Sequence, residues 1–528
     1  MLSKQTNCPL SIVHCKLYSV VFVLFAFFVV VPVIYTLVSA LFIGGSFIDN
    51  LLLLNRDTFL LLATSCIIAL FIALFSTLFG TVLGFLLYKT NVKYRGGFKI
   101  SLLIPLFISP YILAVAWKDF FFLFFNNTSF LSSYIGVILV LITIFTPLSM
   151  LIIGSALSNI NTQLEESGFM ITNFRSVILK IILPLIKPAL ISSFVLVFIF
   201  SISEFSVPAF FGVKVFTTEI FTQFSAFYNH SLAILQSALL IIICVSLLFA
   251  ERKHIADAPF LSVSGQGTSS KFYSLKSWNL LSILFLFGWF FISVILPFII
   301  LFVQSFKGGT SKFFQAFKLL LPTFGNSIGL AFMGALIIVF VGFTAAYLSA
   351  KHTRKLFDWL LLIIFAIPST IFGISLIKFY NHPILDFIYS SYAIILIGYV
   401  GKFSFISAKL IANAIKQIPD SLDEAAQIEG ISFFTRLRKI LIPLIMPTLF
   451  VAFIISFIFS LGELGTTIML YPPGTEIMPI KVFTIMANAP QSLTSSMTLI
   501  VFSITLLIIT SFYFIMTPTI KKYSFTND

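Results

Sequence analysis

Charged residues are scarce in this sequence. Lysine, arginine, aspartate and glutamate make up 9% of the 528 residues, only 18 side chains are acidic, and 59% of the residues are hydrophobic. A soluble protein of this length could not cover its surface with so few charges. Apolar runs of roughly 20 residues, enough to cross a bilayer, recur along the whole chain. The composition therefore excludes a soluble protein and predicts an all-α polytopic membrane protein.

Several chemical signatures are also missing. The four cysteines form no framework, since Cys66 and Cys244 lie in apolar runs and only Cys8, His14 and Cys15 in the amino-terminal tail resemble a loose metal site. Loosely spaced thiols in a tail seldom bind a metal, so we expect no metal and no cofactor. The sequence has no HExxH, CxxC or triad arrangement and no G-x-x-x-x-G-K-[ST] phosphate loop. The chain is therefore not expected to be an enzyme or to bind ATP itself.

The apolar runs predict twelve membrane spans. The first, from Leu17 to about Ile43, is too long for the core of a signal peptide, about 7–15 residues, and is expected to remain as a span. Pro105, Pro110 and Pro368 predict kinked or interrupted helices. The remaining spans are expected near residues 58–88, 98–125, 131–157, 190–212, 231–250, 278–305, 325–350, 357–380, 384–408, 447–470 and 495–518.

The net charge of +14 is placed unevenly between the connecting segments. If the amino terminus lies inside, most basic residues fall in the inner segments. The outer loops then hold only Arg56, Lys214, Lys307, Lys312, Lys318 and Lys481. This bias follows the positive-inside rule, so it predicts a multi-pass membrane protein with both termini in the cytoplasm. The basic charge is explained by the lipid bilayer, and no nucleic acid is expected as a partner.

The chain contains an internal duplication. Residues 162–190 align without a gap with residues 421–449, and the alignment continues until Glu204 meets Glu463. It matches Glu165 with Glu424, Phe174 with Phe433, Lys180 with Lys439, Pro184 with Pro443 and Pro188 with Pro447. The sequence therefore predicts two tandem six-helix units, residues 1–250 and 278–528. They are joined by a polar cytoplasmic linker, residues 251–277, which is rich in serine and glycine.

Each unit carries one charged loop between apolar runs. Ser421 and Glu424, like Thr162 and Glu165, have the spacing of a capping box at the start of a helix. Gly430 is placed to end the second of these helices in a left-handed conformation. A further helix is expected from about Phe433 to Ile442, with Pro443 starting the return to the membrane; it carries Arg436, Arg438 and Lys439. Such a loop could be merely a solvated helix, but its duplication at fixed spacing favours a docking element for a two-fold partner.

The second loop resembles a known family motif. "EAAQIEG" (424–430) followed by "ILIPLIMP" (440–447) is similar to the EAA loop of binding-protein-dependent ABC importer permeases, and through the repeat the resemblance covers nearly the whole chain. In that family the loop forms a coupling helix that docks on a separate ATP-hydrolysing subunit. The resemblance implies an ATPase-coupling role for Glu424, Ala425, Ala426 and Gly430, and also for Glu165 and Gly168. The first loop, residues 162–190, departs from the motif, since its "EESGFMI" lacks the alanine pair and has isoleucine where glycine should be.

Glu204 and Glu463 are matched carboxylates within predicted spans. Such acids are costly in a membrane and usually face a cavity or a partner. They could line the translocation path, or they could serve as structural acceptors for backbone and hydroxyl groups nearby. Lys118, Lys378 and Lys402 are expected to extend toward a membrane interface.

The resemblance thus implies the transmembrane permease subunit of an ABC importer in the bacterial cytoplasmic (inner) membrane, with a cytoplasmic ABC ATPase dimer and a periplasmic substrate-binding protein as partners. The fused layout, "SEFSVPAFFG" (203–212) and "GELGTTIMLYPPG" (462–474) resemble permeases of the iron(III) group most. Thiamine, phosphonate, polyamine or sulfate permeases share much of the pattern and remain alternatives. An ion-gradient-driven secondary transporter is the alternative from another class, although its halves are often inverted and its coupling acids lie near the midplane. A membrane enzyme is a weaker third alternative.

Overall fold

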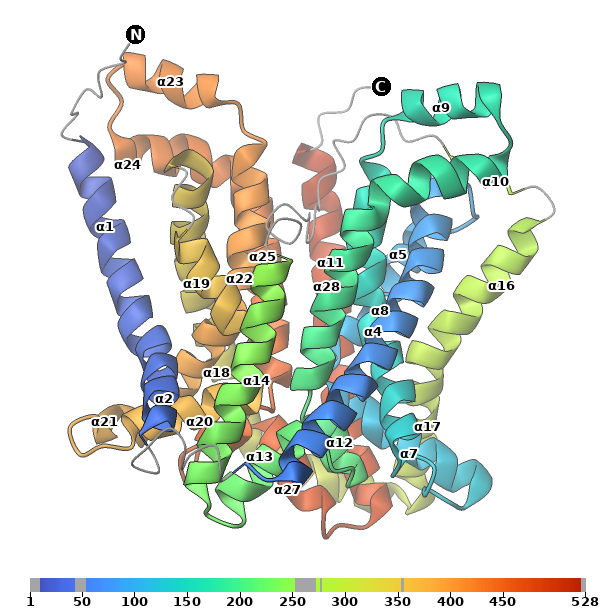
Figure 1. Ribbon diagram of the computed structural model, residues 1–528, viewed down its shortest axis with the longest axis vertical. Coiled ribbons are helices and arrows are strands. Elements are labelled where there is room, and N and C mark those ends of the chain that lie inside the picture. Colours follow the sequence, from blue (N-terminus) through green and yellow to red (C-terminus); the bar gives the residue numbers. More distant parts are fainter. Residues whose placement is uncertain (1–9, 43–53, 252–271, 276–277, 353–355, 524–528) are drawn as a thin grey trace.

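The computed structural model describes residues 10–42, 54–251, 272–275, 278–352 and 356–523, and within these ranges the chain is helical apart from loops and an isolated bridge between Thr90 and Tyr273. The helices stand side by side in one bundle, and short helices lie at both of its ends (Figure 1).

The first part of the chain forms α1 (Leu10–Phe25), η1 (Ala26–Val30), α2 (Val31–Leu41), α4 (Arg56–Lys89), α5 (Arg95–Ser101), α6 (Ile104–Phe107), α7 (Pro110–Phe125), α8 (Tyr134–Ser158), α9 (Thr162–Ile171), α10 (Phe174–Val177), η2 (Ile178–Ile182), α11 (Leu183–Ser203), α12 (Ser206–Phe211), α13 (Phe216–Ser225) and α14 (His230–Ala250), where η marks a π-helical segment. The second part forms α16 (Asn279–Phe290), η4 (Phe291–Ile295), α17 (Leu296–Lys307), α18 (Thr310–His352), α19 (Leu356–Ala366), α20 (Ser369–Tyr380), α21 (Asp386–Tyr389), α22 (Ala393–Lys416), α23 (Asp420–Ile428), α24 (Phe433–Arg436), η5 (Leu437–Leu441), α25 (Ile442–Gly462), α26 (Thr467–Leu470), α27 (Met478–Met486) and α28 (Gln491–Tyr523).

Ten helical segments of the described residues are long and apolar enough to cross a bilayer, and two bent helix pairs bring the number to as many as twelve. The pairs join α5–α6 to α7 with a bend of 95° and α19 to α20 with a bend of 106°. Both breaks fall at a proline, because Pro110 is the first residue of α7 and Pro368 precedes α20. Proline cannot donate the backbone hydrogen bond that would continue a helix. The all-α prediction is confirmed, and so are these two interruptions.

Two spans lie earlier in the sequence than hydropathy places them. The predicted spans 190–212 and 447–470 are wrong in their bounds, since the helical segments run from Phe174 to Ser203 and from Phe433 to Gly462. Each segment ends at a glutamate whose backbone is extended, with ψ of 126° at Glu204 and 124° at Glu463. The apolar sequence continues beyond both glutamates, so hydropathy carries no signal for these ends.

Two other boundaries also differ from the prediction. The stretch with Lys312 and Lys318, expected as an outer loop, is the first part of the 43-residue helix α18. The span predicted at 384–408 begins only at Ala393 and continues to Lys416, because the short helix α21 and its turns occupy the preceding residues.

The spans formed by α1–α2 and by α16–α17 each pack against helices that are distant in the sequence. Phe25 lies against Phe357 of α19, with ring centroids 5.3 Å apart. At the opposite side of the bundle, Trp289 of α16 lies 4.7 Å from Phe79 of α4. Figure 1 shows α1 beside α19 at one edge and α16 beside α5 at the other. The amino-terminal part of the chain and the part that begins at α16 therefore interlock through these spans.

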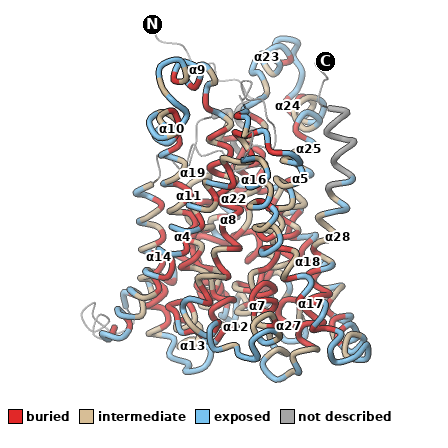
Figure 2. Tube along the Cα trace, turned by 90° about the vertical axis from the view of Figure 1, so that its right-hand side faces the viewer, coloured by how far each residue is buried: buried red, intermediate tan, exposed pale blue. Residues whose placement is uncertain are grey.

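The outside of the bundle is suited to lipid. In Figure 2 buried residues follow the middle of the bundle and exposed residues follow its outer helices. On α4, Leu60, Ile67 and Leu74 are 54%, 55% and 49% exposed, whereas Ile72 and Ala73 on the opposite face are fully buried. In water such a face would be unfavourable, because each CH₂ group left exposed forgoes about 0.8 kcal/mol of burial free energy. In a bilayer the same face contacts lipid acyl chains, and this cost does not arise.

Candidate functional site

Two short helices, α9 and α23, lie at the same end of the bundle (Figure 1). Helix α9 begins after Asn161, whose side-chain oxygen accepts a hydrogen bond of 2.9 Å from the N–H two residues on. Helix α23 begins after Pro419 and has no side-chain cap. The predicted capping boxes are therefore wrong, since Thr162 and Ser421 already lie inside the first helical turns. The helices themselves are present where they were predicted.

Helix α23 ends as the sequence predicts. Gly430 has a φ of +72°, and its N–H donates to the carbonyl of Gln427 at 3.0 Å. The next N–H donates to the carbonyl of Ala426 at 3.1 Å, which completes the turn. Helix α9 ends without a glycine: Thr172 is extended, and its N–H donates to the carbonyl of Gly168 at 2.9 Å.

We expect Gly430→Val to impair the loop that follows α23. Side chains disfavour the left-handed conformation by about 1–2 kcal/mol, and a β-branched residue suffers most. No heavy atom lies within 4 Å of a Cβ built at Gly430, so the backbone conformation alone is under test. Uptake by cells and the amount of protein in the membrane should be measured together, and uptake is expected to fall while the amount is kept.

Two controls sharpen this test. Gly430→Asn should retain most uptake, because asparagine tolerates the left-handed region. Ile171→Val should be nearly silent, since Ile171 is 86% exposed at the end of α9 and has no positive φ. Equal losses in Gly430→Val and Ile171→Val would contradict a special role for the turn.

The side chain of Glu165 points into the protein. Its carboxylate is fully buried, forms an ion pair with Lys89 at the end of α4, and accepts a hydrogen bond of 2.6 Å from the Tyr273 hydroxyl. Burial and the neighbouring carboxylate raise the pKa of Tyr273 well above its usual value, so its hydroxyl remains a donor. The backbone of Tyr273 also bonds to the Lys89 carbonyl (2.8 Å) and the Asn91 N–H (3.1 Å). The segment 272–275 is thereby attached to the base of α9.

Helices α9 and α23 expose matching apolar side chains. Leu164 and Leu422, the third residue of each helix, are 51% and 47% exposed. Met170 and Ile428, the ninth residue of each, are 88% and 86% exposed. Large apolar side chains so fully exposed at the end of a membrane bundle are characteristic of a contact surface for another protein.

Aligning α9 and α23 from their first residues differs by one position from the ungapped sequence alignment, which pairs residue 162 with residue 421. Counted from the helix starts, residues 166–168 correspond to residues 424–426, and in both the first residue is exposed and the last is buried. Glu165 then corresponds to Asp423, which also forms an internal ion pair, with Arg436 at 3.2 Å. The ungapped alignment misses this because the connection after α23 is longer than the one after α9.

A cavity of about 280 Å³ is lined by residues from two parts of the chain, 106–206 and 365–465. Its polar lining includes Glu204, Glu463, Lys402 and Lys409. Most of the remaining wall is apolar and aromatic: Phe107, Phe145, Phe200, Phe365, Phe403, Phe405 and Phe459. The two carboxylates that the sequence alignment matches, Glu204 and Glu463, thus line the same cavity.

The two carboxylates also hold the backbone that follows them. Glu204 accepts the N–H of Ser206 at 2.8 Å, and Glu463 accepts the N–H groups of Thr466 at 2.8 Å and Thr467 at 3.0 Å. They therefore cap α12 and α26, the role proposed as the structural alternative, and they do so from the cavity wall. Both roles are compatible with the same position.

Lys402 does not extend to an interface, and that expectation is wrong. Its side chain is buried, and its ammonium donates to the carbonyls of Phe365 (3.0 Å) and Ile367 (2.6 Å). These carbonyls are released where α19 breaks before α20, so the lysine satisfies acceptors that the interrupted helix leaves open. Sequence alone gave no signal for this contact, because the break and the lysine lie on different spans.

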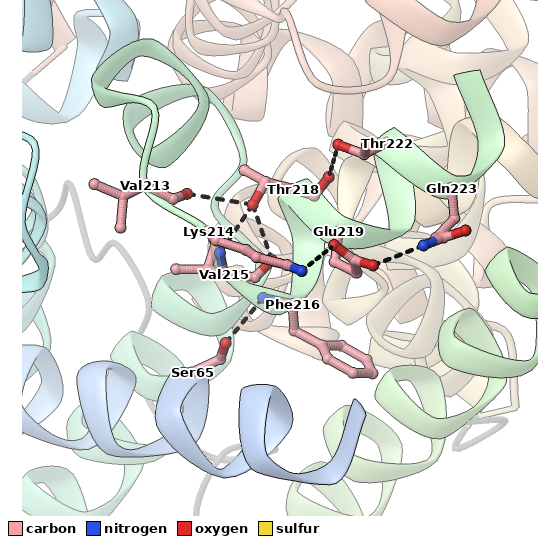
Figure 3. Close-up of polar contacts among 9 residues, drawn as sticks. All are labelled: Ser65, Val213, Lys214, Val215, Phe216, Thr218, Glu219, Thr222 and Gln223. Atoms are coloured by element: carbon pink, nitrogen blue, oxygen red, sulfur yellow. Dashed lines mark hydrogen bonds and ion pairs between the residues drawn. The ribbon is translucent and has the colours of Figure 1, made fainter. Parts of the chain in front are cut away.

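At the opposite end of the bundle, α13 and α27 are held by equivalent contacts (Figure 1). Ser65 of α4 accepts a hydrogen bond of 2.9 Å from the N–H of Phe216, the first residue of α13. Ser327 of α18 accepts one of 2.7 Å from the N–H of Met478, the first residue of α27. Figure 3 shows the first of these contacts beside the ion pair of Lys214 and Glu219.

Comparison with known proteins agrees with this architecture. Residues 338–522 match the family described as "Binding-protein-dependent transport system inner membrane component". This match, which runs from α18 into α28, identifies the second part of the chain as similar to binding-protein-dependent transport permeases. The permease is 24% identical over 409 residues to the Fe(3+)-transport system permease protein FbpB 2 of Haemophilus influenzae, covering 76% of this chain and 78% of that protein. It is also 24% identical over 501 residues to the ferric transport system permease protein FbpB of Actinobacillus pleuropneumoniae, covering 87% and 72% of the two chains.

These similarities support a transport permease as the class of protein. The permease is a multi-pass membrane protein of an inner-membrane transport system and not an enzyme. This sets aside the gradient-driven transporter and the membrane enzyme. Within the described residues of the permease, no group of three or more histidine, cysteine, aspartate or glutamate side chains is placed to hold a metal. The tail residues Cys8, His14 and Cys15 lie outside the residues whose side chains are described.

Proposed function

We propose that the permease forms the translocation path for iron(III) delivered by a periplasmic binding protein, and that a cytoplasmic ABC ATPase dimer drives it. Two relatives that align over most of this chain are named for ferric iron transport. A protein of Salmonella typhimurium named for 2-aminoethylphosphonate transport aligns over only 34% of the chain. Iron(III) is therefore preferred, and thiamine, phosphonate, polyamine and sulfate remain alternatives.

Residues 1–250 and 278–528 are proposed as the two halves, with residues 251–277 as the linker. The repeated contacts support this division, since Ser65 and Ser327 hold α13 and α27 in the same way. The end that carries α9 and α23 is assigned to the cytoplasm, and with it both termini. The first turn of α1 and the last turn of α28 lie at that end (Figure 1).

The proposal of a two-fold ATPase partner rests on the exposed apolar side chains of α9 (Leu164 and Met170) and α23 (Leu422 and Ile428). In the second half, Glu424, Ala425, Ala426 and Gly430 are assigned to coupling. In the first half, Glu165 and Gly168 support α9 from within, because both are buried. Glu166 takes the exposed position that corresponds to Glu424. One helix from each half would then meet one subunit of the ATPase dimer.

Glu204 and Glu463 are proposed to face the path at the cavity. Two carboxylates in a mostly apolar wall favour a cation over an anion, since an anion is repelled by like charge in a medium of low dielectric constant. This argues for iron(III) or thiamine and against sulfate and phosphonate. Lys402 and Lys409 offset part of that negative charge at the same cavity.

Uptake by cells lacking the gene tests the substrate. Labelled iron(III) and labelled thiamine should each be supplied, with and without the gene restored. We expect iron uptake to be lost and then restored, while thiamine uptake is unchanged. Lost thiamine uptake beside normal iron uptake would overturn the assignment to iron and keep the importer. If the uptake of neither iron(III) nor thiamine changes, labelled sulfate, phosphonate and polyamine should be tested next in the same assay.

A further inference from the structure

The loops that precede α13 and α27 are built alike. Gly212 and Gly474 both have positive φ, of 68° and 80°. Three residues later the chain is extended at the cap of each short helix, with φ of −128° at Val215 and −110° at Ile477. We call the segments 212–219 and 474–481 the first and second outer loops. Their positions can therefore be compared one by one.

The charges of the two outer loops are reversed at matched positions. In the first loop Lys214 forms an ion pair with Glu219, with an N–O distance of 3.2 Å. In the second loop Glu476 and Lys481 form the pair at 2.7 Å. Both pairs join the third residue of the loop to the eighth, so lysine stands where the other loop has glutamate.

The more exposed partner differs in sign between the loops. The side chain of Lys214 is 67% exposed and that of Glu219 only 14%. In the second loop the side chain of Glu476 is 38% exposed and that of Lys481 24%. The first loop therefore exposes its cation far more than its anion, and the second loop exposes its anion somewhat more than its cation. Two halves with otherwise similar backbones are made different at this end by charge.

We propose that the two outer loops form a docking surface for the periplasmic binding protein, whose lobe over the first loop carries an acidic group and whose lobe over the second carries a basic group. The inference rests on the proposed function. Reversed charges fix the orientation of such a partner, because turning it by a half-turn brings like charges together at both loops. The loops lie at the end of the bundle opposite α9 and α23, where a periplasmic partner must bind (Figure 1).

The ion pairs could instead serve only to hold each loop in shape. Exchanging both members of a pair separates the two explanations, because it keeps the ion pair and inverts the charge that is presented. The two exchanges are Lys214→Glu with Glu219→Lys, and Glu476→Lys with Lys481→Glu. A purely structural role predicts that both exchanged chains behave as the original does.

The experiment uses lipid vesicles that contain the permease and its ATPase, enclosed ATP, and substrate-loaded binding protein outside. Initial uptake is measured against binding-protein concentration at low and high salt. Each exchange is expected to raise KM for the binding protein about tenfold at low salt, to leave kcat within about twofold, and to have less effect at high salt. The chain with both pairs exchanged should have a lower KM than either single exchange, since the partner can then dock after a half-turn.

An unchanged KM in both single exchanges, in vesicles that transport normally, would overturn the docking surface and leave the proposed function in place. Absence of any binding-protein-dependent uptake with the original chain would overturn both. If an exchanged chain fails to insert, Lys214→Met and Glu476→Gln replace it, with an expected rise in KM of about threefold. An unchanged KM in these two variants would likewise overturn the proposal.

Discussion

Permeases carrying Met170→Asp or Ile428→Asp are expected to fold and to insert, but to lose more than nine-tenths of ATP-driven uptake. Both side chains are almost fully exposed, at 88% and 86%, so the substitutions should change the stability of the isolated chain by no more than about 0.5 kcal/mol. In a complex, each would leave a carboxylate without a partner in a contact built for an apolar side chain. That costs about 1–3 kcal/mol or more, which weakens docking about fivefold at the low end and more than about a hundredfold at the high end.

The measurement is copurification of the ATPase with the permease, together with uptake by the same cells. Met170→Leu and Ile428→Leu are the matched controls, because they keep an apolar side chain of similar size, and both should retain copurification and uptake. Loss with Ile428→Asp alone would restrict docking to the second half. Normal copurification with both aspartate variants would contradict the contact surface on α9 and α23.

The second large effect is expected from Lys89→Met. This change removes the cation that compensates the fully buried carboxylate of Glu165 and leaves only the Tyr273 hydroxyl as a strong partner. Breaking a buried ion pair on one side costs about 3–5 kcal/mol, since an uncompensated charge remains in the interior. Thermal unfolding of the purified permease should show a markedly lower midpoint, and uptake should fall with it.

The double variant Lys89→Met with Glu165→Gln tests the cause. Because both charges are then absent, most of the lost stability should return, and the amide oxygen of the introduced glutamine can still accept the Tyr273 hydrogen bond. Tyr273→Phe alone should cost less, about 1.5–3 kcal/mol, the loss of one hydrogen bond to a charged group. Equal destabilisation by the single and double variants would show that the methionine is poorly packed and that the charge is not the cause.

The sequence predicted the spans well because a membrane helix depends on local composition. Interrupted spans were also accessible, since Pro110 and Pro368 stand at the breaks themselves. The ends at Glu204 and Glu463 were not accessible: a carboxylate that accepts N–H groups a few residues on ends the helix, while the hydropathy around it stays high. Composition cannot distinguish such a cap from a polar residue inside a span.

The candidate coupling site was predictable in position and less so in detail. Gly430 adopts the left-handed conformation that its place after a helix predicts. The role of Glu165 could not be foreseen, because its partner Lys89 belongs to another helix and Tyr273 to the linker. Contacts between residues so far apart in the sequence depend on how the helices are arranged, and an ungapped alignment cannot reveal that one loop is longer than the other.

The interlocking of the first spans has a consequence for biosynthesis. Phe25 packs on Phe357, and the carbonyl of Phe28 accepts a hydrogen bond of 3.0 Å from the Tyr380 hydroxyl. These partners are translated about 330 residues later, so at about 5–20 residues per second the first helix waits roughly 15–70 s in the bilayer before it can dock. During that interval the first helix must stay near the rest of the growing chain, held by the insertion machinery or by the short connection to the next helix. If translation pauses before Phe357 is made, the nascent chain should therefore be inserted in the bilayer but still open to proteolysis.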